Sequence, residues 1–162
     1  MLLWFVATAV LTVGAVFRDP RFDHRLLVVG SVLPLADAAL GARVLHSVVV
    51  SIAVLVVVML ATSRGSDRRR TLLGLPIGMF LHLVFDASWN DTATFWWPLT
   101  GLAPPDGALP IVRHGWWGVA LEAVGVVACA WLWRANGLGD AARRRRFLAD
   151  GRLAVTAPSP RR

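Results

Sequence analysis

Five long runs of apolar residues account for most of this 162-residue chain and constrain its fold more than any other feature. The runs cover residues 2–17, 26–40, 44–62, 71–89 and 116–133, and short polar or basic stretches separate them. Their apolar residues are largely continuous rather than arranged in amphipathic stripes, and a helix that crosses a bilayer needs about 20 such residues. The sequence therefore predicts an all-α fold, a polytopic membrane helical bundle of about five transmembrane segments.

Composition argues against an ordinary soluble domain. The chain is 56% hydrophobic with a mean hydropathy of +0.60, whereas about 45–50% is usual for soluble proteins. The net charge of +7 comes from arginine alone, and the arginines are clustered. Clustering favours a role in membrane topology over a basic face, so we expect no nucleic-acid partner. The single cysteine, Cys129, excludes an intramolecular disulfide and a cysteine-based zinc site.

Arginine placement predicts the orientation of the chain. Basic clusters occur at residues 18–25, 64–70 and 143–146, and cytoplasmic loops of membrane proteins collect arginine. All three fall inside in a five-span topology with the N-terminus outside and the C-terminus inside. We therefore expect an integral membrane helical domain at residues 1–135, an outer tryptophan-rich loop at 90–115, and a basic, partly disordered cytoplasmic tail at 136–162.

Two polar residues interrupt the fourth apolar run. His82 and Asp86 are four residues apart, so on a helix they lie on one face, one turn apart. A carboxylate within a membrane helix is costly and is usually partnered and functional. This pair can supply two ligands to one metal ion. A buried hydrogen-bonded pair that only fixes helix packing is the alternative.

Other polar residues are expected at the same depth, near the outer face. Asp37 and His46 fall at the outer ends of the second and third runs, Glu122 in the outer half of the fifth, and His114 in the adjoining loop. Each has a structural alternative. Asp37 is also typical of a helix cap, His46 and His114 of interfacial or loop histidines, and Glu122 of a partner for an outer arginine such as Arg113.

Four short motifs follow one another between residues 26 and 100. They are Gly30-Ser31-Val32-Leu33-Pro34 followed by Asp37, then Leu45-His46-Ser47, then His82-Leu83 with Asp86, then Trp97-Pro98. Their order and spacing resemble those of the inner-membrane metal-dependent hydrolase family, which includes LexA-regulated bacterial membrane proteins. That pattern reads approximately Gly-x-x-x-Pro-Asp-x-Asp, His-Ser, His-Leu-x-x-Asp, and a proline after an aromatic residue. Leu35 stands where the family usually has its first aspartate. The resemblance implies a bacterial inner-membrane protein whose metal ligands are Asp37, His46, His82 and Asp86.

This ligand set predicts a hydrolase. Two histidines and two aspartates suit Zn²⁺, with Mn²⁺ or Fe²⁺ as alternatives. A site at the outer face predicts metal-assisted cleavage of a phosphoester or acyl bond in a lipid or lipid-linked substrate. We expect Asp86 to act in the catalytic centre and Glu122 to shuttle the proton. The rival hypotheses are a non-enzymatic membrane subunit with a structural polar cluster, and a small metal or proton carrier.

Overall fold

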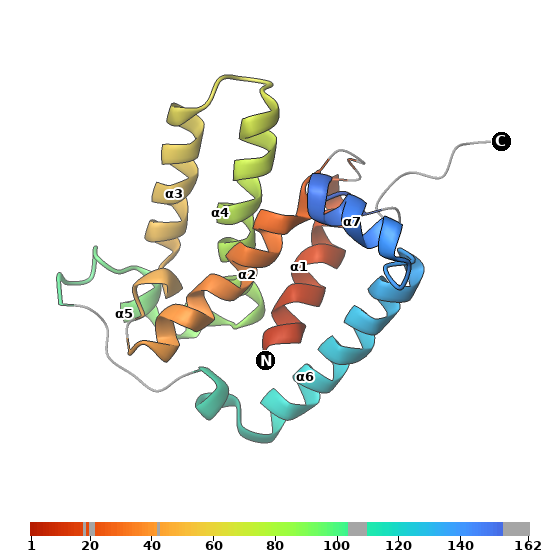
Figure 1. Ribbon diagram of the computed structural model, residues 1–162. Helices are drawn as coiled ribbons and strands as arrows, with labels where there is room; N and C mark the ends of the chain where they lie inside the picture. The colour runs from red at the N-terminus through yellow and green to blue at the C-terminus, as the bar shows by residue number, and fades with distance from the viewer. Residues whose placement is uncertain (18, 20–21, 42, 104–109, 154–162) are drawn as a thin grey trace.

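The structure is a computed structural model that describes residues 1–17, 19, 22–41, 43–103 and 110–153, with only the backbone described for 110–114. Within these ranges all regular secondary structure is helical, which confirms the predicted all-α class (Figure 1). The elements are α1 (Leu2–Phe17), α2 (His24–Ala39), the 3₁₀ turn η1 (Val44–His46), α3 (Val48–Ala61), α4 (Asp67–Phe85), the 3₁₀ turn η2 (Ser88–Asn90), α5 (Thr92–Phe95), α6 (Pro110–Ala135) and α7 (Ala141–Asp150).

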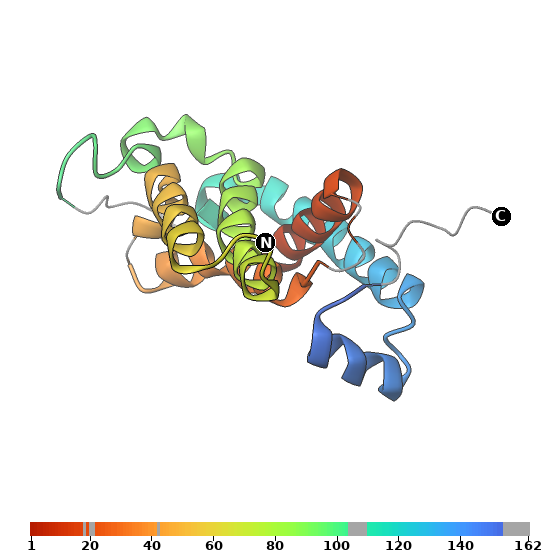
Figure 2. The same ribbon diagram turned by 90° about the horizontal axis from the view of Figure 1, so that it is seen from above.

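The five longest helices differ in what they contact. Seen from above, α3, α4, α1 and α6 follow one another across the molecule (Figure 2). Helix α2 packs against both α4 and α1, and α6 packs against α1. Successive long helices run in opposite directions, so the start of α2 and the link at residues 62–66 lie at one end of the molecule and η1 lies at the other (Figure 1).

Glycines let α2 and α4 approach each other closely. A Cβ at Gly78 would lie 2.3 Å from the carbonyl oxygen of Leu27, and one at Gly30 would lie 2.1 Å from that of Leu75. Gly74, one turn before Gly78, also faces the α2 backbone. Such small residues at a four-residue spacing are typical of tightly packed helices in membranes. The contact brings the backbone of α2 against the part of α4 that carries His82.

Helix length does not confirm the predicted five spans. Among the described residues, Gly115–Ala135 is the one helix long and apolar enough to cross a membrane. Helices α1 and α3 are apolar but have 16 and 14 residues, which corresponds to about 24 and 21 Å of length. Helix α4 has 19 residues but starts with Asp67 and three arginines.

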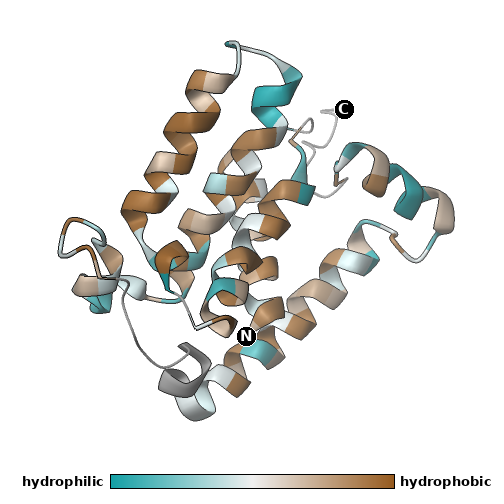
Figure 3. Cartoon of the chain, turned by 60° about the vertical axis from the view of Figure 1, so that its left-hand side comes forward, coloured by the Kyte–Doolittle hydropathy of each residue, from teal (hydrophilic) through white to brown (hydrophobic). Residues whose placement is uncertain are grey.

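Much of the apolar surface is exposed. Helix α3 buries only Val48, Ser51 and Val58, although nearly all of its length is apolar (Figure 3). Helix α6 likewise exposes large side chains, including Trp117 and Val127. Exposed apolar surface of this extent is unusual for a soluble monomer.

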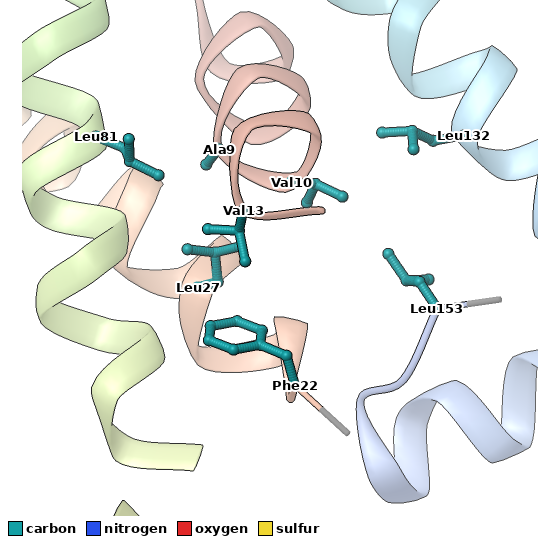
Figure 4. Packing of buried hydrophobic residues seen from close by; sticks show 8 residues of the cluster. All are labelled: Ala9, Val10, Val13, Phe22, Leu27, Leu81, Leu132 and Leu153. Carbon is teal, nitrogen blue, oxygen red and sulfur yellow. The ribbon is translucent and has the colours of Figure 1, made fainter. Parts of the chain in front are cut away.

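The start of the predicted tail is ordered and docks on the bundle. The side chain of Arg25 donates to the carbonyls of Leu148 and Ala149, at the end of α7. Leu153 joins the hydrophobic core with Phe22, whose cluster also includes Ala9, Val10, Val13, Leu27, Leu81 and Leu132 (Figure 4). Residues 136–153 therefore belong to the folded unit, and residues 154–162 lie outside the described part of the chain.

Candidate metal centre

Three buried side chains from two segments of the chain lie close together. His46 ends η1, His82 lies in the last turn of α4, and Asp86 is the residue that caps α4. Each offers one ligand atom, and these three atoms all lie within 4.8 Å of one another. His46, His82 and Asp86 are 0%, 1% and 6% exposed, respectively. This group could hold a metal ion, as the spacing of His82 and Asp86 predicted.

His82 is oriented by the backbone of α2. Its Nδ1 lies 2.7 Å from the carbonyl oxygen of Ser31. Because a carbonyl can only accept, Nδ1 must carry the proton, which leaves the lone pair on Nε2. Nε2 is buried and has no hydrogen-bond partner. Phe5 of α1 stacks on the ring, with centroids 3.9 Å apart. A backbone carbonyl on one ring nitrogen and an open lone pair on the other is the usual arrangement of a metal-binding histidine.

His46 is the most unusual member of the group. It is fully buried, and neither Nδ1 nor Nε2 has a hydrogen-bond partner. Its ring lies 5.4 Å from that of His82, at 83°. An unpaired polar atom in the interior costs about 1–3 kcal/mol. A bound cation would satisfy one of these nitrogens and so remove part of that cost.

Asp86 is fixed at a sharp turn. Its N–H donates to the carbonyl of His82 at 2.8 Å, which keeps the two side chains one turn apart. Its Oδ2 accepts a hydrogen bond from the hydroxyl of Ser88 at 2.9 Å. Ala87 between them has φ +54°, the left-handed conformation that costs a non-glycine residue about 1–2 kcal/mol. Backbone strain of this kind clusters at functional sites.

Asp37 has a different place from the one that the family resemblance implied. It is described but lies outside the group of mutually close ligand atoms. Its Oδ2 instead accepts the N–H of Leu45 at 2.8 Å. Asp37 therefore anchors the turn that presents His46, and the ligand group has three members rather than four.

Glu122, the expected proton shuttle, also lies elsewhere. Its carboxylate accepts hydrogen bonds from the N–H groups of Leu3 and Trp4 at 3.1–3.3 Å, and the amino group of Met1 lies 3.5 Å away. Glu122 thus caps the start of α1 and is not a member of the three-ligand group. The side chains of His114 and Arg113 lie outside the described ones.

The sequence interpretation missed the contacts that hold the loop after α4 over this end of the molecule. Ser47 caps α3 and donates to the carbonyl of Trp97. Arg43 is buried and pairs with Asp91, with its Nη1 3.0 Å from Oδ2. Burial opposes ionisation of Asp91, but hydrogen bonds from Thr94 and Arg43 lower the pKa of its carboxyl below the usual value. The cap was recognisable in the sequence as a serine before an apolar run. The Arg43–Asp91 pair joins residues 48 positions apart and had no local signal.

Comparison with models of known protein families, with curated proteins and with solved structures finds no match to this chain. The donor atoms of the group therefore indicate which ion it could hold. Two neutral imidazoles and one carboxylate suit zinc, and the same set also binds non-haem iron. The unpartnered nitrogens of His46 and His82 fit such an ion.

Proposed function

We propose that this protein is a membrane-embedded metal-dependent hydrolase that cleaves a phosphoester or acyl bond of a lipid or lipid-linked substrate at the outer face. The observation that carries the proposal is the buried group of His46, His82 and Asp86, in which histidine nitrogens lack hydrogen-bond partners. Structural zinc sites are closed by four protein ligands, whereas catalytic sites keep one position open. Three protein ligands leave that position free.

Each protein group has a definite task in this scheme. His46, His82 and Asp86 hold the ion, the carbonyl of Ser31 keeps Nδ1 of His82 protonated, and Ser88 orients the carboxylate of Asp86. Zn²⁺ is the ion we favour, with Mn²⁺ or Fe²⁺ as alternatives. When bound, such an ion would act as a Lewis acid and activate water near neutral pH.

Two features support a multi-pass topology with the site at the outer end. Residues in or next to the first two basic segments, together with two residues that follow the third, line one polar cleft of about 430 Å³: Asp23, Arg25, Asp67, Arg70, Thr71, Asp150 and Arg152. The metal group lies at the opposite end of α4, 15 residues after Asp67, which is about 22 Å along a helix. A cytoplasmic location of the basic end then sets the metal group near the outer face.

An apolar cavity supports an amphiphilic substrate. It has a volume of about 130 Å³, lies between α3 and α4, and is lined by Ser51, Ile52, Leu55, Pro76, Ile77 and Phe80. Ser51 is one turn beyond Ser47, to whose carbonyl its hydroxyl donates at 3.3 Å. Ligand pockets for drug-sized molecules are roughly 300–1,000 Å³, so this space suits part of an acyl chain rather than a head group.

The same observations weigh against the rival hypotheses. A polar cluster that serves only helix packing would be expected to satisfy its own hydrogen bonds, and His46 makes none through its ring. A carrier needs a polar path to the other side, and the cavity between α3 and α4 is almost entirely apolar.

Metal analysis of the purified full-length protein tests the proposal. We expect wild type to hold about one zinc ion per chain, and His82→Ala and Asp86→Ala to lose it. Asp67→Asn is the control, because the side chain of Asp67 is exposed at the opposite end of α4, and this variant should keep the ion. Zinc-loaded wild type in phospholipid vesicles should release a head group or a fatty acid, and Asp86→Ala should not. Absence of bound metal, with stability unchanged by a chelator, would leave the structural-subunit hypothesis as the better one.

A further inference from the structure

A buried arginine lies beside the candidate metal centre. Arg43 is 5% exposed and caps η1, whose last residue is the ligand His46. The N–H of His46 donates to the carbonyl of Arg43 at 3.2 Å. Residues three apart in a 3₁₀ turn lie on the same side, so Arg43 and His46 are neighbours on η1.

The guanidinium of Arg43 keeps one N–H group without a hydrogen-bond partner. Nη1 donates to Asp91, but the buried Nε has no hydrogen-bond partner. An arginine stays charged under all ordinary conditions and presents its N–H groups as a planar fork. Because an unmet buried donor is costly, this donor favours a ligand that supplies acceptor oxygens.

Charge balance indicates what such a ligand must be. A divalent ion with neutral His46, neutral His82 and ionised Asp86 leaves one net positive charge, while Arg43 and Asp91 cancel each other. The N-terminus of α3, which starts two residues after His46, adds partial positive charge. A buried net positive charge calls for an anion. A neutral acyl ester supplies none before it reacts, whereas a phosphoester does.

We propose that the substrate's reacting group is a phosphoester, and that Arg43 binds its oxygens beside the metal centre in competition with Asp91. This inference rests on the proposed function and narrows it to phosphoester cleavage. In that hydrolysis, the oxygen of water bonds to phosphorus as the ester P–O bond breaks. The leaving oxygen takes the proton that water gives up, so no oxidant, reductant or further reactant is needed.

Binding of inorganic phosphate to the zinc-loaded full-length protein, measured by calorimetry, tests this assignment. We expect wild type to bind phosphate and Arg43→Gln to bind it roughly tenfold to hundredfold more weakly, since a hydrogen bond to a charged group is lost. Zinc content should be unchanged in this variant. Arg68→Gln is the control, because Arg68 is exposed and lies at the opposite end of α4, and its phosphate affinity should equal that of wild type.

A second variant separates anion binding from a purely structural salt bridge. Asp91→Asn removes the carboxylate that competes for the guanidinium, so phosphate should bind more tightly than in wild type. If Arg43 served only to hold Asp91, Asp91→Asn would leave phosphate affinity unchanged or lower it. Unchanged or lower phosphate affinity in zinc-containing Asp91→Asn, or wild-type phosphate affinity in Arg43→Gln, would overturn the assignment of Arg43 as the phosphoester ligand. Neither result would overturn the proposed function. Failure of wild type to bind zinc would instead overturn the proposed function.

Discussion

Both carboxylate oxygens of Glu122 face the first turn of α1, where backbone N–H groups have no partner within the helix. A negative charge at a helix N-terminus stabilises it through hydrogen bonds and through the helix dipole. The first turn of α1 also carries Phe5, which stacks on His82. Glu122 therefore stabilises the turn of α1 that carries Phe5, from a position outside the group of His46, His82 and Asp86.

Glu122→Gln separates this capping role from proton transfer. We expect the free energy of unfolding to fall by about 1 kcal/mol, with unchanged zinc content and a hydrolysis rate within a few-fold of wild type. Unfolding in detergent, metal analysis and the vesicle assay measure the three quantities. A rate loss of about 10²–10⁴-fold without loss of stability would instead restore the proton-shuttle role.

At single positions, the sequence was informative where local geometry decides the outcome. The four-residue spacing of His82 and Asp86 fixes their shared face, and the helix preserves it with the N–H of Asp86 on the carbonyl of His82. Asp37 lies near the end of α2, three residues after Pro34, and its spacing did not determine where its carboxylate points. The N–H of Leu45 binds that carboxylate, a contact that depends on how α2 meets η1.

Among the elements, α2 and α4 have the most consequential contact. The carbonyl of Ser31 can reach His82 only because Gly78 lets the two backbones approach. A small-residue spacing of this kind is visible in the sequence at Gly74 and Gly78. The sequence did not show which helix would pack against these glycines, because several apolar runs are equally hydrophobic.

Gly78→Ala should therefore damage stability and metal binding together. Its Cβ would lie 2.3 Å from the carbonyl oxygen of Leu27 and 2.7 Å from the backbone nitrogen of Ser31, so α2 must move away. Overpacking of this kind costs about 1–3 kcal/mol, and displacement of the Ser31 carbonyl should weaken zinc binding about 10–100-fold.

Gly139→Ala is the matched control for that experiment. Its nearest neighbour is the indole nitrogen of Trp133 at 4.0 Å, so a methyl group fits without movement. Zinc titration and thermal unfolding of both variants give the comparison. Wild-type zinc affinity in a folded Gly78→Ala protein would show that the position of Ser31 does not matter to the metal centre.

For the whole molecule, the apolar runs predicted where helices form better than they predicted helix length. The runs correctly predicted helices and their approximate extents, since continuous apolar sequence without strand periodicity leaves few alternatives. Full membrane spans were predicted from the same runs, yet α1 and α3 are shorter than the roughly 20 residues that a span requires. Polar residues set where helices start: Ser47 caps α3, and Ser66 caps α4.

Orientation in the membrane is the remaining whole-molecule prediction. The segments at the basic end surround one polar cleft, and the metal group lies at the far end of α4. With the basic end in the cytoplasm, Leu102 should be outside and Ser63 inside; both residues are exposed.

We would introduce single cysteines, Leu102→Cys and Ser63→Cys, into a Cys129→Ala protein and treat intact cells with an impermeant thiol reagent. Leu102→Cys should react directly, and Ser63→Cys only after the cells are permeabilised. The reverse pattern would put the metal centre on the cytoplasmic side and exclude a substrate from the outer leaflet. Equal labelling of both positions in intact cells would exclude a membrane barrier between the two ends of α4.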